Sequence, residues 1–314
     1  SRFYSNNEEK LEMPFKAIQI GNVFRAERPQ RGRFRSFKQC DIDIIGDPSV
    51  TAEIELISTT SKALLAIGFE DFIIKVNDRK LLTAFILQQC FKPEDVGSVC
   101  ISLDKADKIG ADGVKEELTA KGYDAGMVAD FVDQAARVTL DTIGTVVDEP
   151  EAVADLHRVI ETVTRMAAGR YTIAFDFTLI RGMGYYTGQV FEVSYGDVGY
   201  SIAGGGRYDH MIGKYSKQSA PAVGFSIGFE RIVGILMERE ADQKRPSKRI
   251  ALFHAADADM AEVIHTADAY REAGYQANLI TQKKKMGKQI NACEEKGYAG
   301  FLVYGRDTVV KPFN

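Results

Sequence analysis

Five arginines crowd a short segment near the start of the chain, at Arg25, Arg28, Arg31, Arg33 and Arg35. The guanidinium group binds phosphate and carboxylate groups through two parallel hydrogen bonds, which makes arginine the favoured residue for such anions. An aromatic ring follows at Phe37, and a ring beside arginines suits the plane of a nucleobase. These residue types at this spacing predict a site for a nucleotide or another anionic ligand.

Polar and apolar side chains alternate just after these arginines. Successive side chains of a β-strand point to opposite faces, so one face carries Phe37, Gln39, Asp41 and Asp43 and the other carries Cys40, Ile42 and Ile44. A sheet that keeps one polar face in water would also explain this alternation. The neighbouring arginines favour a ligand site over a wet sheet face.

Two glycine-rich segments could bring the backbone close to a ligand. Residues 181–188 join Arg181 to a pair of tyrosines that includes Tyr186, and residues 203–209 are a predicted glycine-rich turn that includes Tyr208. Glycine permits close approach of the backbone to a bound group. Either segment could instead be a plain loop, because glycine runs are common in turns.

A further arginine stands where a helix disfavours it. Residues 223–227 read as a strand and residues 229–239 as a helix, which places Arg231 in the first helical turn. The helix dipole disfavours a cation there, and a residue placed against local preference hints at function. Such an arginine could lie over a base or bind a phosphate, whereas Glu230 could also simply offset its charge.

The elements that position these residues can be read from the hydrophobic pattern. Residues 16–25 and 33–45 predict two antiparallel strands around a polar loop at residues 27–32, where Pro29 and Gly32 supply the turn. Ser49 is the expected cap of the next helix. Other strands are expected at residues 72–76, 171–180, 190–195, 200–203 and 223–227, and other helices at residues 81–89, 114–121, 127–136, 151–166 and 229–239.

The pattern changes after a charged linker at residues 241–247. Strands are expected at residues 250–253, 276–280 and 300–303, with helices at residues 260–273 and 287–296 between them. This alternation predicts a small βαβαβ unit. Its most basic point is Lys283, Lys284 and Lys285, which a solvated helix start would also explain.

Composition narrows the class of protein. The net charge of −4 argues against a protein that simply coats nucleic acid. The four cysteines and four histidines are scattered without metal-ligand or disulfide spacing, so a reducing cytoplasm is expected. No apolar run approaches the ~18 residues of a membrane span. The polar residues 1–10 do not resemble a signal peptide.

Four of these segments, in this order along the chain, resemble the signatures of histidyl-tRNA synthetases, a family of class II aminoacyl-tRNA synthetases. Residues 24–43 (FRAERPQRGRFRSFKQCDID) resemble motif 2, and residues 224–231 (GFSIGFER) resemble motif 3. Residues 181–188 (RGMGYYTG) resemble the histidine-specific signature, and residues 205–209 (GGRYD) resemble its companion. The resemblance extends over nearly the whole chain.

The resemblance implies a fold and a reaction. The expected architecture is an α/β protein with a class II antiparallel sheet and flanking helices at residues 1–91 and 170–240, an α+β catalytic core. A helical insertion domain is expected at residues 92–169 and a small α/β anticodon-binding domain at residues 248–314. Histidine would react with ATP to give histidyl-adenylate, and tRNA(His) would then take the histidyl group. Mg²⁺ would accompany ATP on unassigned ligands, and the expected form is a cytoplasmic homodimer.

The resemblance also implies roles for individual residues. Arg25 would bind the α-phosphate, Arg33 the outer phosphates, and Phe37 and Arg231 would enclose the nucleotide from two sides. Arg181 would stabilise negative charge at the α-phosphate and at the substrate carboxylate, so Arg25 and Arg181 are the expected catalytic residues. Gln39 would meet the polar backbone groups of the amino acid, and Asp43, Tyr186 and Tyr208 would recognise the imidazole.

The chain departs from the family pattern at three places. Motif 1 and a Thr-Leu-Arg-Pro-Glu-like segment have no counterpart ahead of motif 2, Gly184 stands where an Asp is common, and residues 305–311 are compressed. We therefore expect a fragment, or a sequence from which residues are missing.

Two non-catalytic relatives are alternatives: the histidine-sensing regulatory subunit of ATP phosphoribosyltransferase, and a pseudo-synthetase domain of a tRNA-sensing regulator. The arginine set at positions 25, 33, 181 and 231, together with the C-terminal α/β unit, favours the synthetase.

Overall fold

The computed structural model describes residues 1–26, 28–29, 33–181, 184–216, 219–242 and 248–313. It divides the chain into two compact units, Ser1–Gly234 and Ile235–Asn314. Several positions singled out in the sequence lie outside the described residues: Arg31 and Gly32 of the predicted loop, Gly182 and Met183 of the signature, and residues 243–247 of the predicted linker. Across the described ranges, no helix is both long and apolar enough to cross a membrane.

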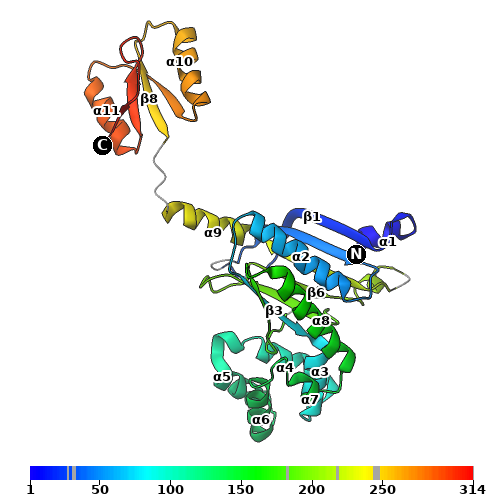
Figure 1. Ribbon diagram of the computed structural model, residues 1–314. Coiled ribbons are helices and arrows are strands. Elements are labelled where there is room, and N and C mark those ends of the chain that lie inside the picture. Colours follow the sequence, from blue (N-terminus) through cyan, green and yellow to red (C-terminus); the bar gives the residue numbers. More distant parts are fainter. Residues whose placement is uncertain (27, 30–32, 182–183, 217–218, 243–247, 314) are drawn as a thin grey trace. The chain divides into compact units, whose positions relative to one another are not determined.

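Unit 1 is built on a seven-stranded sheet with the order β1-β2-β7-β6-β5-β3-β4 (Figure 1). Neighbouring strands are antiparallel except β3 and β4, which are parallel. The strands are β1 (Phe15–Phe24), β2 (Ser36–Ile45), β3 (Ile73–Asp78), β4 (Thr172–Phe175), β5 (Gln189–Ser194), β6 (Ala203–Arg207) and β7 (Ala222–Gly228). The antiparallel sheet expected from the sequence is confirmed.

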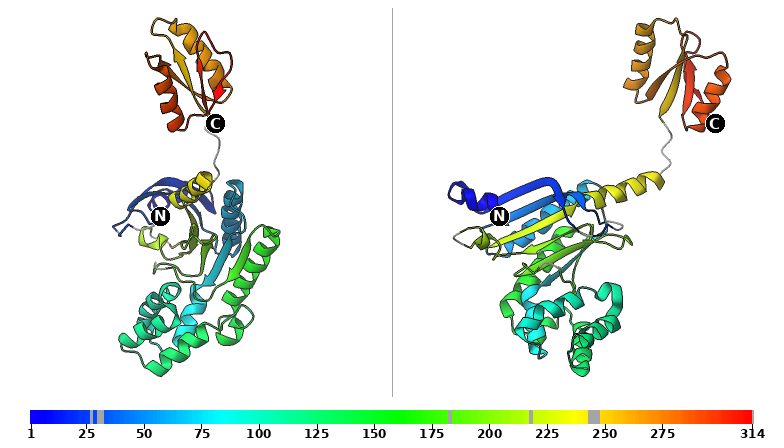
Figure 2. Two further views of the ribbon diagram at one scale, coloured as in Figure 1. Left: turned by 90° about the vertical axis from the view of Figure 1, so that its left-hand side faces the viewer. Right: turned by 180° about the vertical axis from the view of Figure 1, so that it is seen from behind.

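Helices cover one face of this sheet. α2 (Thr51–Ala66) packs on β2 and β7, α8 (Pro150–Ala167) packs on β3 and β4 beside α2, and α3 (Arg79–Gln88) packs on β3 (Figures 1 and 2). Arg207, Val223 and Ile44 are direct cross-strand neighbours, and Arg207 bonds to Glu53 of α2. The apolar face of β2 is therefore the face that α2 covers, which leaves the polar face for a ligand.

A group of helices lies between β3 and β4 in the sequence. It comprises α4 (Val96–Leu103), α5 (Ala106–Ala120), α6 (Ala125–Ala135) and α7 (Ile143–Val146), with a short 3₁₀ turn, η2 (Pro93–Asp95), before them. Phe85 of α3 meets Phe131 of α6 at 5.6 Å and Phe177 at 5.1 Å between ring centroids. These aromatic contacts anchor the helical group to the sheet domain. α8, which the predicted boundaries assign to the insertion, packs on the sheet.

Short elements complete unit 1. These are α1 (Arg2–Asn7), η1 (Glu8–Lys10) and η3 (Ile212–Lys214), while α9 (Phe229–Asp242) follows β7 and contains the boundary between the units.

Unit 2 is a four-stranded sheet with the order β11-β10-β8-β9. Its elements are β8 (Arg249–His254), α10 (Met260–Glu272), β9 (Gln276–Thr281), α11 (Met286–Glu295), β10 (Gly300–Val303) and β11 (Lys311–Pro312). Alternate residues of β8 enter two different cores: Ile250 packs with Val263 of α10, and Phe253 packs with Cys293 of α11. The parallel β8 is thus buried on both faces, as its continuous apolar run indicates. The βαβαβ prediction is confirmed, and the antiparallel edge strand β11 was not foreseen.

Five local predictions were wrong in part. The strand expected at residues 200–203 is shifted, because β6 runs from Ala203 to Arg207. The strand expected at residues 171–180 ends at Phe175, because the Asp176 carboxylate accepts from the Thr178 amide (3.0 Å) and hydroxyl (2.7 Å) and turns the chain. Ser49 does not cap α2, whose N-cap position is Val50. The strand expected from residue 33 begins at Ser36, and the expected glycine-rich turn at residues 203–209 contains the central strand β6.

Asp78 couples the stability of unit 1 to pH. It caps α3 by accepting from the Lys80 amide at 2.7 Å, and it is buried. Burial raises the pKa of this carboxyl to about 6. The folded state therefore binds more protons than the unfolded state between about pH 4 and pH 6, so stability falls as pH rises through this window.

Asp78→Asn should remove this dependence, because asparagine caps a helix comparably but carries no charge. Relative to wild type, the variant should gain up to about 3 kcal/mol of unfolding free energy between pH 4 and pH 7.5, as measured by urea denaturation. Asp124→Asn, at the exposed cap of α6, is the matched control. A difference between Asp78→Asn and wild type that stays constant with pH would contradict the assignment.

Candidate active site

β2 and the strands beside it form the floor of the candidate site. Phe37, Gln39, Asp41 and Asp43 share one face of β2, and Ile42 and Ile44 are buried on the other. On β7, Gly228, Ser226 and Gly224 lie directly opposite Gln39, Asp41 and Asp43. The predicted strand parity is confirmed, and it brings an aromatic ring, an amide and two carboxylates to one surface.

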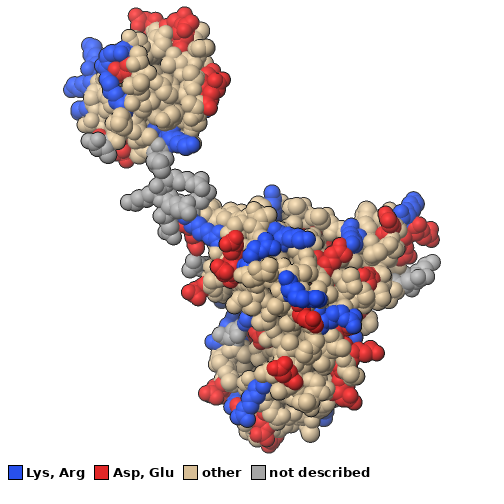
Figure 3. All heavy atoms as spheres, viewed as in Figure 1, with Lys and Arg blue, Asp and Glu red and all other residues tan. Residues whose placement is uncertain are grey.

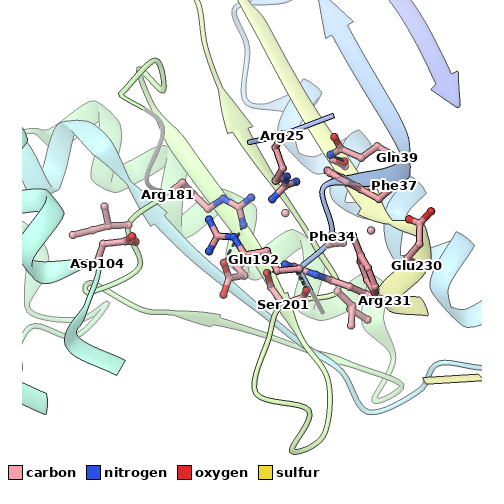
Figure 4. A pocket seen from close by; sticks show the side chains of 17 residues that line it. Arg25, Phe34, Phe37, Gln39, Asp104, Arg181, Glu192, Ser201, Glu230 and Arg231 are labelled. Carbon is pink, nitrogen blue, oxygen red and sulfur yellow. Dashed lines mark hydrogen bonds and ion pairs between the residues drawn. The ribbon is translucent and has the colours of Figure 1, made fainter. Parts of the chain in front are cut away.

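Four arginines line a cavity of about 290 Å³ at this surface, and Figure 4 shows three of them, Arg25, Arg181 and Arg231. We call this cavity the cationic arm; it is lined by Arg25, Arg33, Arg181 and Arg231 together with Phe37 and Gln39. The guanidinium carbon of Arg25 lies 4.1 Å from the centroid of the Phe37 ring. Burial and then the charges of Arg25 and Arg181 lower the pKa of Arg231. Mutual repulsion of this kind is relieved by a bound anion, so the cavity is suited to phosphate groups.

Arg181 packs against the part of β6 that carries no side chains. Its Nη1 donates to Glu192 Oε2 of β5 at 2.9 Å. The guanidinium lies so close to Gly204 of β6 that a Cβ there would overlap it, with Cζ only 2.6 Å away. The glycines of β6 are therefore required by close packing within a sheet, which explains why a turn was the wrong interpretation.

Arg231 is fixed by the loop between β5 and β6. Its Nη1 donates to the Ser201 carbonyl oxygen at 2.5 Å, and its guanidinium carbon lies 5.4 Å from the Tyr200 ring centroid. Glu230 accepts from the Lys38 backbone amide at 2.7 Å. This hydrogen bond links α9 to β2. It gives Glu230 a structural role besides any offset of the Arg231 charge.

A second cavity of about 720 Å³ adjoins the first. We call it the tyrosine arm; its lining includes Asp41, Asp43, Tyr185, Tyr186 and Tyr208. The Tyr208 hydroxyl donates to Asp43 Oδ1, and the Tyr185 and Tyr186 hydroxyls lie 3.4 Å apart. The linings of both arms share eight residues: Arg25, Arg33, Phe37, Gln39, Asp104, Arg181, Gly204 and Ser226. The two cavities therefore form one site with a cationic end and a tyrosine–carboxylate end, which we call the bipolar site.

The electrostatics of the tyrosine arm differ from those of the cationic arm. Burial raises the pKa of Asp43, while the hydrogen bond from Tyr208 opposes the rise. Burial and the Asp43 charge raise the pKa of Tyr208, which keeps its hydroxyl protonated at neutral pH. A carboxylate acceptor beside hydroxyl groups suits a polar ring that both donates and accepts hydrogen bonds.

All nine residues predicted for the site line one or both arms. Arg28 and Arg35 are exposed and line neither arm, and Arg31 lies outside the described residues. The sequence reasoning missed Glu192 and Ser226. Glu192 was detectable as the single charge in an apolar strand. Ser226 was not, because its importance depends on which strand lies beside β7.

Comparison with known proteins supports a family assignment. A family model described as histidyl-tRNA synthetase matches residues 2–232. The histidine–tRNA ligase of Leifsonia xyli is 36% identical over 98% of this chain and 73% of the relative, and that of Helicobacter pylori strain J99 is 31% identical over the same shares. This chain thus spans about three quarters of these relatives.

Solved structures agree with the sequence relatives. Histidyl-tRNA synthetase from Nostoc sp. PCC 7120 superposes with a TM-score of 0.69 at 26% identity, over 95% of this chain and 72% of that one. A Bacillus halodurans structure named as an ATP phosphoribosyltransferase regulatory subunit/histidyl-tRNA synthetase also gives 0.69, at 19% identity over 96% and 76%. That second likeness concerns the fold alone.

Two adjacent glycines of β6 should respond differently to alanine. A Cβ at Gly205 would overlap the backbone of β7 at Gly224 and Phe225, whereas the nearest neighbours of a Cβ at Gly204 are atoms of the movable end of Arg181. Gly205→Ala should therefore lower the free energy of unfolding by about 1–3 kcal/mol, as measured by urea denaturation. Gly204→Ala should leave stability nearly unchanged, because the Arg181 guanidinium can move aside. Equal destabilisation by both substitutions would contradict this distinction.

Proposed function

The chain belongs to the histidyl-tRNA synthetase family, and we propose that it is a histidine–tRNA ligase that forms histidyl-adenylate from histidine and ATP and then charges tRNA(His). The observation that carries this proposal is the bipolar site, in which four arginines and a tyrosine–carboxylate cluster meet at Arg181. A polyphosphate fits the first arm and a polar ring fits the second. The reacting carboxylate and α-phosphate would meet between them.

The proposed nucleotide site is the cationic arm. Arg25 would bind the α-phosphate and Arg33 the outer phosphates, each as a guanidinium fork on phosphate oxygens. The base would stack on Phe37, with Arg231 on the other side of the nucleotide. Because Arg25 lies over the Phe37 ring, stacking on that face requires Arg25 to move toward the phosphates.

The proposed histidine site is the tyrosine arm. Asp43 would accept from an imidazole N–H, and the hydroxyls of Tyr208 and Tyr186 would complete the recognition of the ring. Arg181 would bind the substrate carboxylate and Gln39 the remaining polar group of the amino acid. An apolar amino acid would leave these buried groups without partners, which is a strong basis for rejection.

The proposed reaction depends on position and charge. A carboxylate oxygen of histidine attacks the α-phosphorus, a new P–O bond forms, and the bond to the β-phosphate oxygen breaks to release pyrophosphate. A terminal ribose hydroxyl of tRNA then attacks the carbonyl carbon and AMP leaves. Arg181 and Arg25 would offset the charge that builds on the α-phosphate, and the site would hold both reactants in line.

Mg²⁺ would accompany ATP in this proposal. Among the described residues, no three histidine, cysteine, aspartate or glutamate side chains form a group that could hold a metal ion. Magnesium commonly uses one or two carboxylates together with substrate phosphates. The carboxylates of Asp104, Glu192 and Glu230 line the cationic arm, and one of them, together with the phosphates, would supply such ligands, while the metal would neutralise phosphate charge.

We propose tRNA as the partner of unit 2. Lys283, Lys284, Lys285 and Lys288 are exposed around the start of α11, and Figure 3 shows basic side chains on the side of this unit that carries α11. The helix dipole disfavours cations at this end. A polyanion such as the tRNA anticodon stem would compensate that unfavourable placement.

We further propose a cytoplasmic homodimer. β1 is an edge strand whose Ile18, Ile20 and Phe24 are each about 70% exposed, and apolar edges of this kind are usually covered by another chain. The four cysteines are free thiols, which suits a reducing compartment. The alternative role as a non-catalytic regulatory subunit would use only histidine binding and would leave the cationic arm without a reaction.

Incubation of the protein with ATP, Mg²⁺ and labelled pyrophosphate should give label in ATP only when histidine is present. This follows because adenylate formation is reversible and requires the amino acid. Alanine and phenylalanine serve as control amino acids. Histidine binding without any exchange would contradict the ligase proposal and favour the regulatory alternative.

Arg181→Ala should mainly lower turnover. Loss of a donor that stabilises transition-state charge costs roughly 10²–10³-fold in kcat, while the other three arginines still bind ATP. The measurement is exchange kinetics together with the Kd for ATP from calorimetry. The exposed Arg35→Ala is a control. A large loss of ATP affinity at unchanged kcat would contradict the proposed role.

A further inference from the structure

Asn77 is a buried polar residue beside the candidate site, and the proposed reaction gives it no role. Only 1% of it is exposed, near the end of β3. Asn77 is directly opposite Val190 of β5, and Val190 is directly opposite Gly206 of β6. The same row continues through Gly224 to Asp43. Directly paired residues project from one face of a sheet, so Asn77 lies on the ligand face.

The Asn77 side chain hydrogen-bonds to residues 176–181, which we call the approach segment. Its Nδ2 atom donates to the carbonyl oxygens of Phe177 at 2.8 Å and Leu179 at 3.1 Å. Its Oδ1 atom accepts from the Asp78 backbone amide at 2.8 Å. A carbonyl oxygen can only accept and an amide N–H can only donate, so these partners define the orientation of the Asn77 amide and use both of its hydrogens. The amide therefore links β3 to the approach segment in one orientation.

The approach segment depends on this link because it belongs to no helix or strand. The carbonyl groups of Phe177 and Leu179 are therefore outside any regular hydrogen-bond ladder, and the side chains of both residues are buried. A buried carbonyl group needs a partner from elsewhere in the protein. Asn77 supplies that partner to both carbonyl groups and so fixes the path of the chain toward Arg181.

Asp176 attaches the start of the approach segment to the same strand. Its backbone amide donates to the Val76 carbonyl oxygen at 3.0 Å, and its carboxylate forms an ion pair with Lys75 at 2.9 Å. Burial alone would raise the pKa of this carboxyl, but its hydrogen bonds lower the pKa below the usual value, so the group is ionised at neutral pH. β3 thus holds the approach segment at two places, through Asp176 and through the Asn77 amide.

Arg181 is the last residue of the approach segment. Glu192 holds its guanidinium end, whereas the position of its backbone depends on the approach segment. Asn77, Arg181 and Tyr186 line the same void of about 10 Å³, which places the Asn77 amide directly beside the site. A displacement of about 1 Å at a reacting group can cost roughly 10²-fold in rate. A shift of the approach segment would therefore reach the guanidinium that stabilises the reacting phosphate.

We propose that Asn77 and Asp176 are positioning residues that anchor the approach segment to β3 and thereby hold the Arg181 guanidinium where the α-phosphate of ATP would react. The inference rests on the proposed ligase function and deepens it. Neither Asn77 nor Asp176 lines the cationic arm or the tyrosine arm. Both would therefore act through Arg181 and not by contact with a substrate.

A double-mutant cycle separates this role from a general structural one. Asn77→Ala and Asp176→Ala are each made alone and together with Arg181→Ala. Histidine-dependent ATP–pyrophosphate exchange gives kcat, calorimetry on the intact protein gives the Kd for ATP, and urea denaturation shows that each variant is folded under assay conditions. Leu64→Ala is the matched control, because Leu64 is fully buried in α2 on the opposite face of the sheet. Asp176 is only half-buried, so its variant decides the question if Asn77→Ala does not fold.

Asn77→Ala should lower kcat about 10–100-fold and change the Kd for ATP less than about twofold, because only a transition-state contact is lost. Asp176→Ala should lower kcat in the same way but by less, since the Asn77 amide still holds the approach segment. In the Arg181→Ala background, either substitution should lower kcat further by less than about twofold, because the group that it positions is absent. Leu64→Ala should change neither quantity by more than about twofold.

Unchanged kcat in the single variants, or losses as large in the Arg181→Ala background as in wild type, would overturn the inference while leaving the ligase proposal intact. An equal loss of kcat in Leu64→Ala would also overturn it, because reduced stability would then explain the effect. A wild-type protein without histidine-dependent exchange would overturn the proposed function, and this inference with it.

Discussion

The buried ion pair between Arg207 and Glu53 is the interaction on which the site depends. Arg207 donates through Nε and Nη2 to the two carboxylate oxygens of Glu53, at 2.5 and 2.6 Å. Its remaining hydrogens reach the carbonyl oxygens of Asp47 and Ser49 and the side chain of Asp209. Loss of one partner from a buried pair costs about 3–5 kcal/mol, because the other charge is left unpaired. The pair therefore fixes the end of β6 to the first turn of α2.

That attachment determines the position of the next residue in the chain. Tyr208 follows Arg207 and points to the other face, where its hydroxyl binds Asp43. The Asp209 carboxylate accepts from the Ala222 amide at 3.0 Å, and the Asp209 amide donates to the Thr187 hydroxyl at 3.0 Å. The charged network on the helix-covered face thus holds the tyrosine–carboxylate pair on the ligand face. Because successive side chains along a strand point to opposite faces, adjacent residues supply the stabilising contacts of Arg207 and the ligand-face contact of Tyr208.

Much of this arrangement could be predicted from residue order. The two-residue period of β2 identified the face that carries Phe37, Gln39 and Asp43, because a half-buried strand sorts its side chains by parity. The alternation of strands and helices in unit 2 was equally predictable from the sequence. The central strand β6 was misread because three consecutive glycines favour a turn locally. Their presence is explained by close neighbours: the Arg181 guanidinium at Gly204, the β7 backbone at Gly205, and the Gln189 carbonyl oxygen with the Tyr186 ring at Gly206. Ser226 and Glu192 act through neighbours on other strands, and strand order is not written in local sequence.

The glycine strand at the centre of the sheet also limits how the site could change. β6 offers no side chains at Gly204, Gly205 and Gly206. A larger residue at one of these positions would fill the cavity or separate the strands, and it would not produce a pocket for a different substrate. Variation in substrate choice must then arise on β2 and at Tyr185 and Tyr186, which line the tyrosine arm. β6 is thus the fixed part of the floor, and changes in specificity are confined to β2 and to these two tyrosines.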